Sequence, residues 1–294
     1  MRRTVIAAFL VWCLFGVAQG QYSESFVFGD ARPDAPELAY RGDHGVGVRT
    51  LEVTNPDQLD ILRWTEEETD PRYDRPLTLE VWYPALIPEG EEEMTEYQDF
   101  LGAGPDNPER PNTPFSFRGR ALRDAEPDTS GGPYPLVIVS HGYPGSRYLM
   151  AYLADNLASK GYLVVAIDHT ESTRTDRAAF SSTLLNRPLD ILFVLDAVAE
   201  MAESSDGFWA GLADADNTGL IGYSMGGYGV INAAGAGISQ TGVDQPWGVP
   251  GGHLAVRQTG NPDFIASQDA RIKAVVLLAP WGGDLFYDAE GMAQ

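Results

Sequence analysis

Cysteine is almost absent from this chain: one residue, Cys13, occurs among 294, and it lies in an apolar run near the N-terminus. A single thiol cannot form an internal disulfide, so side-chain packing has to hold the core. Basic residues are scarce as well, since 20 Lys and Arg face 42 Asp and Glu, and the net charge is −22. Such a charge repels phosphate backbones, and we therefore expect no nucleic-acid partner. The hydrophobic content of 44% and the aromatic content of 11% exclude a disordered chain.

Residues 1–20 have the parts of a secretory signal peptide. Two arginines are followed by an apolar run from Val5 to Ala18, and Ala18-Gln19-Gly20 provides small residues at the cleavage site. The apolar run is too short for a stable membrane span. We therefore expect cleavage near Gln21 and a mature protein that is secreted or periplasmic. An N-terminal anchor that is not cleaved is the alternative.

Residues 21–132 form an N-terminal region that is rich in proline and charged residues. Its two strand-like runs, Gly45–Val53 and Leu77–Tyr83, have no helical segment between them and predict an antiparallel edge of a sheet. The acidic run Glu89–Glu93 is typical of a solvated surface, and we expect no metal site there. Proline is dense in the segment Pro105–Pro114, which predicts loop structure.

Short apolar runs alternate with helix-length segments in the rest of the chain, residues 133–294. This alternation is typical of right-handed βαβ units, so the sequence predicts a mainly parallel sheet with helices on both faces. The predicted strands are Leu136–Val139, Tyr162–Ile167, Thr218–Tyr223 and Ile272–Leu278, and the predicted helices are Ser146–Lys160, Pro188–Met201 and Met225–Ala236.

The segment Gly222–Gly227, with the sequence Gly-Tyr-Ser-Met-Gly-Gly, matches the pattern G-x-S-x-G. It follows a predicted strand and opens a predicted helix, which is the position of a nucleophilic serine on a sharp turn. The helix N-terminus places backbone N–H groups and the positive end of the helix dipole beside Ser224. The sequence therefore predicts Ser224 as a catalytic nucleophile. A glycine-rich turn without chemistry is the alternative interpretation of this pattern.

A second turn, Ser140–Gly145, follows the predicted strand Leu136–Val139 and precedes a predicted helix. In enzymes with a serine elbow, a turn in this place supplies the second N–H group that binds the oxyanion. We therefore predict the N–H groups of Tyr143 and Met225 as the two oxyanion donors, and loss of one such donor costs about 3 to 4 kcal/mol of transition-state stabilisation. His141 precedes the elbow in the chain, so we expect it to support the turn rather than to act as the base.

Five segments together resemble the secreted branch of the α/β-hydrolases. The resemblance extends over about residues 77–283 and is to bacterial platelet-activating-factor-acetylhydrolase-like proteins, which are also described as predicted dienelactone hydrolases. Bacterial polyester hydrolases and cutinases share the turn, the elbow and an Ala-Pro-Trp strand end. The five segments are Leu79–Pro84, Ser140–Gly145, Arg187–Asp190, Gly222–Gly227 and Leu278–Gly283.

The resemblance implies an α/β-hydrolase fold and a serine-dependent hydrolysis of carboxylic esters through an acyl-enzyme. It also implies a reaction without a metal ion or an organic cofactor. Ser224 would be the nucleophile, with Tyr143 and Met225 as the oxyanion residues. The substrate would be a small-molecule, lipid or polymer ester, and Tyr143 and Trp281 would form the aromatic walls around its acyl group.

The chain departs from this family in the residues that activate the serine. An elbow serine needs a histidine base and an acid, and in this fold both follow the serine along the chain. Only His253 follows Ser224, and Pro280 occupies the place in which the acetylhydrolase pattern has its acid. We therefore expect the acid and the base to lie beyond Gln294, in a longer hydrolase whose last strands and helix this chain lacks. A sheet without its last strands has an apolar edge, which favours association.

The remaining candidates for base and acid have weaker positions. His253 lies in a glycine-rich loop, His169 follows the strand Tyr162–Ile167, and His44 precedes the first strand. Asp284 lies near the end of the last strand, a few residues past the expected place. These residues stay open as alternatives: His253, His169 or His44 as the base, and Asp284 as the one plausible acid within the chain.

Two other functions stay open. A hydrolase-fold binding protein without catalysis would account for the missing histidine, and a serine peptidase of the same fold would share the elbow. The segments Trp82-Tyr83-Pro84 and Ala279-Pro280-Trp281 favour ester hydrolysis, because they carry the resemblance to esterases.

Overall fold

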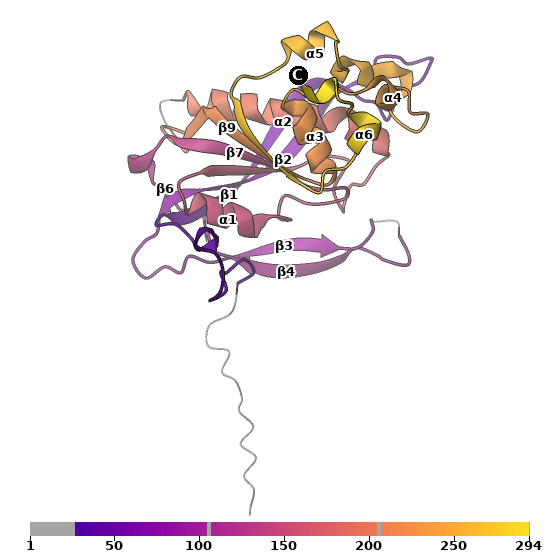
Figure 1. Cartoon of the computed structure of the whole chain (residues 1–294). Helices are drawn as coiled ribbons and strands as arrows, with labels where there is room; N and C mark the ends of the chain where they lie inside the picture. The colour runs from indigo at the N-terminus through magenta and orange to yellow at the C-terminus, as the bar shows by residue number, and fades with distance from the viewer. Residues whose placement is uncertain (1–26, 105–106, 205–206, 294) are drawn as a thin grey trace, which may run out of the picture.

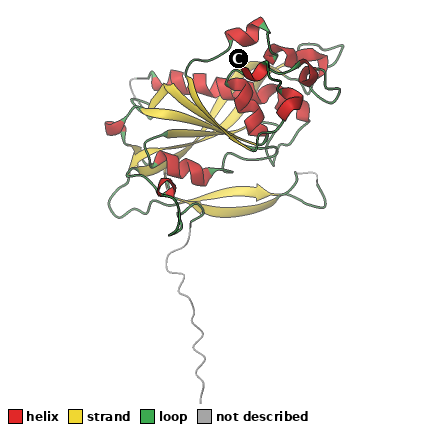
Figure 2. Ribbon diagram, in the orientation of Figure 1, coloured by secondary structure: helices red, strands yellow, loops and turns green. Residues whose placement is uncertain are grey.

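The computed structural model describes residues 27–104, 107–204 and 207–293. The signal peptide predicted at residues 1–20 lies outside the described residues. One large sheet forms the centre, helices lie on both of its faces, and a separate two-stranded sheet lies beyond the helix α1 (Ala151–Ala158; Figure 1, Figure 2). The strands are β1 (Gly45–Leu59), β2 (Arg72–Leu86), β3 (Thr95–Leu101), β4 (Thr113–Gly119), β5 (Leu122–Arg123), β6 (Glu126–Pro127), β7 (Tyr134–Ser140), β8 (Leu163–Asp168), β9 (Ala213–Tyr223) and β10 (Ile272–Leu278).

The strand order in the large sheet is β10-β9-β7-β8-β2-β1-β5, and β6 pairs with β2. Strands β8, β7, β9 and β10 are parallel, whereas β2 pairs antiparallel with both β1 and β8. The predicted α/β-hydrolase fold, a mainly parallel sheet with an antiparallel N-terminal edge, is confirmed. Because the carboxyl ends of parallel strands meet at one edge, the turn after β7 and the elbow after β9 lie side by side, with Ser140 opposite Gly222 in the register.

Successive side chains of β7 face opposite sides of the sheet, and each side is covered by helices. Leu136 and Ile138 pack in one core cluster with residues of α2, and Val137 and Val139 pack in another cluster with residues of α1. In the described part of the chain, no helix is long and apolar enough to cross a membrane. The other helices are α2 (Phe180–Ala202), α3 (Met225–Ala233), α4 (Gln240–Val243), α5 (Pro262–Ala266) and α6 (Gly283–Phe286), and the short 3₁₀ helices are η1 (Glu37–Ala39), η2 (Thr129–Gly131), η3 (Pro250–Arg257) and η4 (Gly291–Ala293).

The helix predicted at Ser146–Lys160 is shorter in the structure, because α1 begins at Ala151. The residues before it are held by bonds to other parts of the chain. The hydroxyl of Ser146 donates to Asp99 at 2.6 Å, and the backbone N–H of Arg147 donates to Asp168 at 2.5 Å. The backbone here follows these bonds instead of an α-helix.

The helix predicted to start at Pro188 begins at Phe180 in the structure, so that boundary is wrong, and Pro188 lies inside the helix. A proline has no N–H group to donate to the carbonyl four residues earlier, which here belongs to Leu184. The hydroxyl of Tyr228 in α3 donates to the carbonyl oxygen of Leu184 at 2.9 Å. A tertiary hydrogen bond thus replaces the missing helical one, and the helix continues through the proline.

The hairpin of β3 and β4 was not predicted, because prolines are dense in the segment Pro105–Pro114. The loop predicted there is wrong at its end, since β4 begins at Thr113 and includes Pro114. The hairpin covers the outer side of α1 (Figure 1). Tyr97 of β3 anchors it, since its hydroxyl accepts a hydrogen bond from Trp82 Nε1 at 2.7 Å and donates to Asp155 of α1 at 3.4 Å. Long-range contacts of this kind, which local patterns do not show, hold the hairpin in place.

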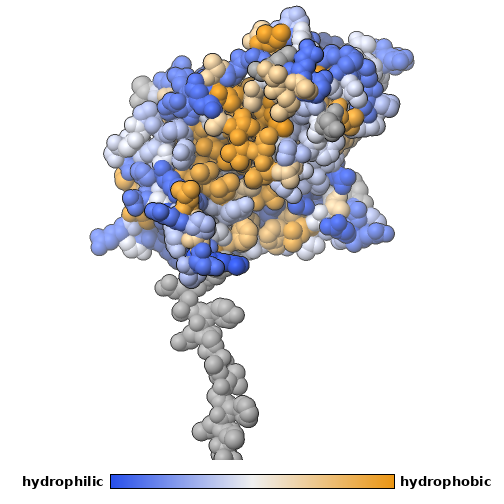
Figure 3. Space-filling view, viewed as in Figure 1, coloured by the Kyte–Doolittle hydropathy of each residue, from blue (hydrophilic) through white to orange (hydrophobic). Residues whose placement is uncertain are grey.

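Among the described residues, strand β10 is the outer strand of the parallel side, and it differs from the other parallel strands in its exposure. Its residues after Ile272 are exposed, and Val276 has 47% of its surface accessible. In Figure 3, apolar side chains gather in the middle of the visible face, where β7, β9 and β10 lie. An apolar outer strand with free backbone groups favours pairing with another chain.

Replacing Val276 with lysine puts a charge in the middle of this outer strand. Because charged side chains on edge strands oppose pairing, we expect Val276→Lys to reduce the concentration-dependent association of the chain of residues 1–294, as measured by light scattering. Ile265→Lys is the matched control, because Ile265 in α5 is 52% exposed but lies outside the sheet. Association that is unchanged in Val276→Lys would contradict the prediction.

Candidate active site

Ser224 lies on a sharp turn between β9 and α3, with a φ angle of 52° and a ψ angle of −114°. A residue other than glycine in such a conformation stores about 1 to 3 kcal/mol of strain, so the surrounding contacts must hold it there. The N–H of Ser224 donates to the carbonyl of Leu278 at 2.9 Å, and its carbonyl accepts from the N–H of Trp281 at 2.8 Å. These bonds fasten the elbow to the end of β10.

The glycines of the elbow are required by close backbone contacts. A Cβ atom on Gly222 would lie 2.4 Å from the carbonyl oxygen of Gly226. A Cβ atom on Gly226 would lie 2.0 Å from the carbonyl oxygen of Ser140. The elbow therefore packs directly on the end of β7, at a distance that leaves no room for a side chain.

The turn Ser140–Gly145 lies beside the side chain of Ser224. A Cβ atom on Gly142 would be 3.5 Å from Cβ of Ser224, so there is room for no more than about one methyl group between the two at this point. Tyr143 follows in this turn, and the buried Met225 is the first residue of α3. The N–H of a first helical residue has no acceptor within the helix and is free to bind an anion.

Aromatic side chains form a wall next to the elbow. The ring of Phe180 lies 5.0 Å from that of Tyr143 and 5.2 Å from that of Trp281. Trp247 extends the wall, with ring centroids 6.3 Å from Phe180 and 6.3 Å from Trp281. A cavity of about 600 Å³ opens beside Tyr143, Arg177 and Phe180. This wall presents aromatic surface beside the elbow.

A chain of buried polar side chains lies beneath the turn. The hydroxyl of Ser140 is 2.8 Å from Nε2 of His169, and Nδ1 of His169 is 2.9 Å from the carboxylate of Asp190. Burial lowers the pKa of His169 to about 4, and the charge of Arg187 acts in the same direction. Burial opposes ionisation of Asp190, but Arg75 and His169 hold the pKa of its carboxyl below the usual value.

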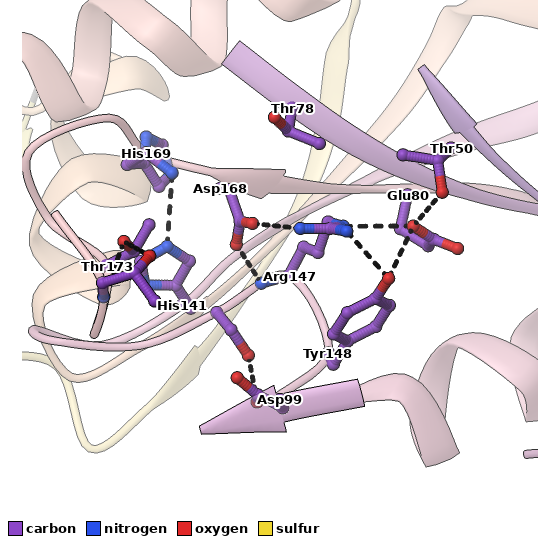
Figure 4. Close-up of polar contacts among 12 residues, drawn as sticks. Thr50, Thr78, Glu80, Asp99, His141, Arg147, Tyr148, Asp168, His169 and Thr173 are labelled. Carbon is purple, nitrogen blue, oxygen red and sulfur yellow. Dashed lines mark hydrogen bonds and ion pairs between the residues drawn. The ribbon is translucent and has the colours of Figure 1, made fainter. Parts of the chain in front are cut away.

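His141 supports the turn, as its position in the sequence predicts. Its Nδ1 is 2.6 Å from the carbonyl oxygen of Gly142, and its Nε2 accepts the backbone N–H of His169 at 3.3 Å (Figure 4). The ring is buried, and burial lowers the pKa of His141 well below the usual value. Its contacts place it inside the protein and not at the hydroxyl of Ser224.

The other two histidines contact aromatic rings. The ring of His44 lies 5.6 Å from that of Tyr134, the first residue of β7, at the opposite edge of the sheet. The ring of His253 lies 5.7 Å from that of Trp64. Within residues 27–104, 107–204 and 207–293, no hydrogen bond joins a histidine to Ser224. The backbone of Asp284 belongs to α6.

Several charged residues inside the protein have roles that the sequence patterns did not indicate. Arg187 donates to the carbonyl of His141 and to the hydroxyl of Ser172, and burial lowers the pKa of Arg187 to about 9. Arg147 pairs with Asp168 and Glu80 (Figure 4). One signal in the sequence could have indicated these roles: Arg187 and Asp190 lie among the apolar residues of α2. Within the described residues, no group of three or more His, Cys, Asp or Glu is arranged to hold a metal ion.

The family model described as PET hydrolase-like matches residues 125–259, which include the turn and the elbow. Cutinase est1 of Thermobifida alba is 31% identical over 101 residues, which are 34% of this chain and 30% of that protein. Epoxide hydrolase B of Mycobacterium tuberculosis is 35% identical over 82 residues, which are 27% of this chain and 22% of that protein. The chain therefore covers less than a third of the length of these relatives.

Among solved structures, a ferulic acid esterase from Streptomyces cinnamoneus is similar with a TM-score of 0.43 and 24% identity, over 64% of this chain and 54% of that chain. The resemblance of the chain to polyester hydrolases and cutinases is confirmed by the family match and by the cutinase match, whereas the resemblance to acetylhydrolase-like and dienelactone hydrolase proteins stays a prediction.

The close contact of Gly226 with Ser140 leads to a prediction. We expect Gly226→Ala to lower the free energy of unfolding by about 3 kcal/mol or more, because the added methyl group collides with backbone that cannot move freely. Gly219→Ala is the matched control on β9, since the nearest atom to an added Cβ is 3.9 Å away. Urea unfolding of both variants measures the difference, and equal stability of the two would contradict the packing described here.

The lowered pKa of His169 predicts a pH dependence of stability. A histidine in an unfolded chain titrates near 6.5, so between pH 6.5 and 4 the unfolded chain binds a proton that the folded protein excludes. This contribution to stability is present above pH 6.5 and is lost as the pH falls towards 4. We expect the stability difference between wild type and His169→Asn to shrink by about 3 kcal/mol over this range. Urea unfolding at several pH values measures it, and a difference that does not change with pH would refute the assignment.

Proposed function

We propose that this chain, an α/β-hydrolase that resembles polyester hydrolases and cutinases, belongs to a serine-dependent hydrolase of carboxylic esters that works through an acyl-enzyme. One observation carries the proposal: Ser224 is held in a strained conformation at the carboxyl edge of the sheet, beside a helix N-terminus. Strained residues of this kind persist where the structure over-determines them, which is typical of active sites. The cutinase and PET hydrolase-like matches support the same reaction class.

In the proposed reaction, the hydroxyl oxygen of Ser224 attacks the acyl carbonyl of the ester, and its proton passes to a general base. The oxyanion that forms is bound by the N–H groups of Tyr143 and Met225. Collapse of this intermediate expels the alcohol, which takes the proton back, and leaves the acyl group on Ser224. Water then releases the carboxylic acid by the same steps. Donors fixed in place before the reaction stabilise this charge without reorganisation.

The proposal assigns the general base and its acid to residues beyond Gln294. The contacts of the four histidines support this assignment, because His141 and His169 are buried among polar partners, and the rings of His44 and His253 pack on Tyr134 and Trp64. A histidine with its ring nitrogens engaged beneath the turn cannot also accept the proton of Ser224.

The aromatic wall indicates the kind of ester. Tyr143 and Trp281 are proposed to line the acyl group of the substrate, and both rings contact Phe180. An apolar acyl group from a small-molecule, lipid or polymer ester would bury its surface on this wall, at about 25 cal/mol for each Å². Export of the protein, by way of the signal predicted at residues 1–20, would bring it to substrates outside the cell.

A fluorophosphonate probe tests the nucleophile. It should label the full-length protein on Ser224, because the probe reacts with an activated serine and its oxygen occupies the oxyanion site. Ser224→Ala should lose the label, and Ser116→Ala, which changes an exposed serine of β4, should keep it. Mass spectrometry of the labelled peptide identifies the residue. Equal labelling of wild type and Ser224→Ala would refute the proposal.

A further inference from the structure

Ser140, His169 and Asp190 form a second arrangement of serine, histidine and acid, separate from Ser224. The three side chains come from the end of β7, from the residue after β8 and from α2. Their exposed fractions are 0%, 1% and 0%, so the arrangement is closed to solvent and to substrate. A nucleophile has to reach the reacting carbonyl, and these residues therefore have a different task.

The hydrogen bonds in this arrangement have a fixed direction. Ionised Asp190 can only accept, so Nδ1 of His169 carries the proton and donates to it at 2.9 Å. Nε2 of the neutral ring is then an acceptor, and the hydroxyl of Ser140 donates to it at 2.8 Å. The order is Ser140 to His169 to Asp190, and we name these three residues the buried relay.

The far end of the buried relay is fixed to the antiparallel side of the sheet. Asp190 binds Arg75 of β2 through two hydrogen bonds of 2.8 and 3.0 Å. Arg75 is 1% exposed and also donates to the carbonyl of Thr170 at 2.8 Å. Bidentate pairs of arginine and carboxylate are the most rigid ion pairs in proteins, because both groups are planar and share two bonds. The buried relay thus connects the end of β7 to Arg75 on β2.

Arg187 holds the same turn from a second direction. Its guanidinium donates to the carbonyl of His141 and to the hydroxyl of Ser172. The carbonyl of Ser172 in turn accepts the N–H of Gly145 at 3.3 Å. Both ends of the turn that carries Tyr143 are therefore held by buried hydrogen bonds, while the turn itself lies beside the elbow at Gly142.

We propose that Ser140, His169 and Asp190 are positioning residues, which fix the turn so that the N–H of Tyr143 meets the oxyanion formed at Ser224; this rests on the proposed function. An oxyanion donor has to lie 2.7 to 3.1 Å from the charge that develops, and a displacement of about 1 Å costs roughly a hundredfold in rate. The turn has six residues, and its two glycines give the backbone conformational freedom. The hydrogen bonds of the buried relay restrict this freedom.

Two substitutions each remove one partner of the hydrogen bond between Ser140 and His169. Ser140→Ala removes the donor. His169→Asn keeps a donor for Asp190, but the shorter side chain has no acceptor at the place of Nε2, where the hydroxyl of Ser140 donates. Ser159→Ala is the matched control, because Ser159 is also 0% exposed and has hydrogen bonds to Asn156 and Gly42, away from the turn. All three variants are made in the full chain, and their thermal unfolding is compared with that of wild type.

The first measurement does not depend on activity. Hydrogen–deuterium exchange of peptides that cover residues 141–145 should be about tenfold faster in Ser140→Ala and in His169→Asn than in wild type, because local opening of the turn becomes easier. Exchange in Ser159→Ala should equal that of wild type at these residues. Unchanged exchange in Ser140→Ala and His169→Asn would overturn the proposal.

The second measurement follows the chemistry. In folded Ser140→Ala and His169→Asn, the rate of fluorophosphonate labelling and kcat for an ester should each fall roughly ten- to hundredfold, with KM unchanged. Equal loss in Ser159→Ala, or a loss that follows the unfolded fraction, would overturn a positioning role. A wild-type protein that is neither labelled nor active would refute the proposed function, while the exchange data would still decide whether the relay holds the turn.

Discussion

The candidate site depends on the contact between two backbone turns. The elbow lies so close to the end of β7 that glycine is required at position 226, and the strained Ser224 is held between this contact and its bonds to Leu278 and Trp281. Parallel pairing of β7 with β9 puts Ser140 opposite Gly222 and so brings both turns to one edge of the sheet. The position of the nucleophile relative to the oxyanion donors is therefore a consequence of sheet register and of the absence of side chains at the elbow.

Buried charges add a second constraint. Arg75, Arg187, His169 and Asp190 are each at most 1% exposed and lie next to one another. Removing charges from water is costly, and the attraction within such a group offsets that cost only when the geometry is exact and the hydrogen bonds are complete. An apolar cluster of the same volume would contribute as much stability or more. The charged cluster instead provides structural specificity. Each of its hydrogen bonds can form only when strand, helix and turn lie in one relative arrangement.

Local patterns predicted the elements that carry the site, and long-range contacts determined the rest. Strand β10 has its predicted bounds, and Ser224 lies on a turn between a strand and a helix, as the glycine pattern requires. The start of α2 was wrong, because the bond from Tyr228 that lets the helix pass through Pro188 cannot be seen in a local window. Arg75 and Asp190 are 115 residues apart in the chain, so the sequence pattern gave no sign that they pair. Local patterns also gave no sign of the hairpin of β3 and β4.

The central claim is that Ser224 forms a covalent acyl intermediate during ester hydrolysis, and intact-protein mass spectrometry tests it most directly. The full-length enzyme is mixed with an activated acyl ester and the reaction is stopped with acid while substrate is still in excess. An acyl-enzyme mechanism predicts a mass increase of one acyl group, located on the peptide that contains Ser224. Hydrolysis that proceeds with no acyl adduct on that peptide would contradict the mechanism.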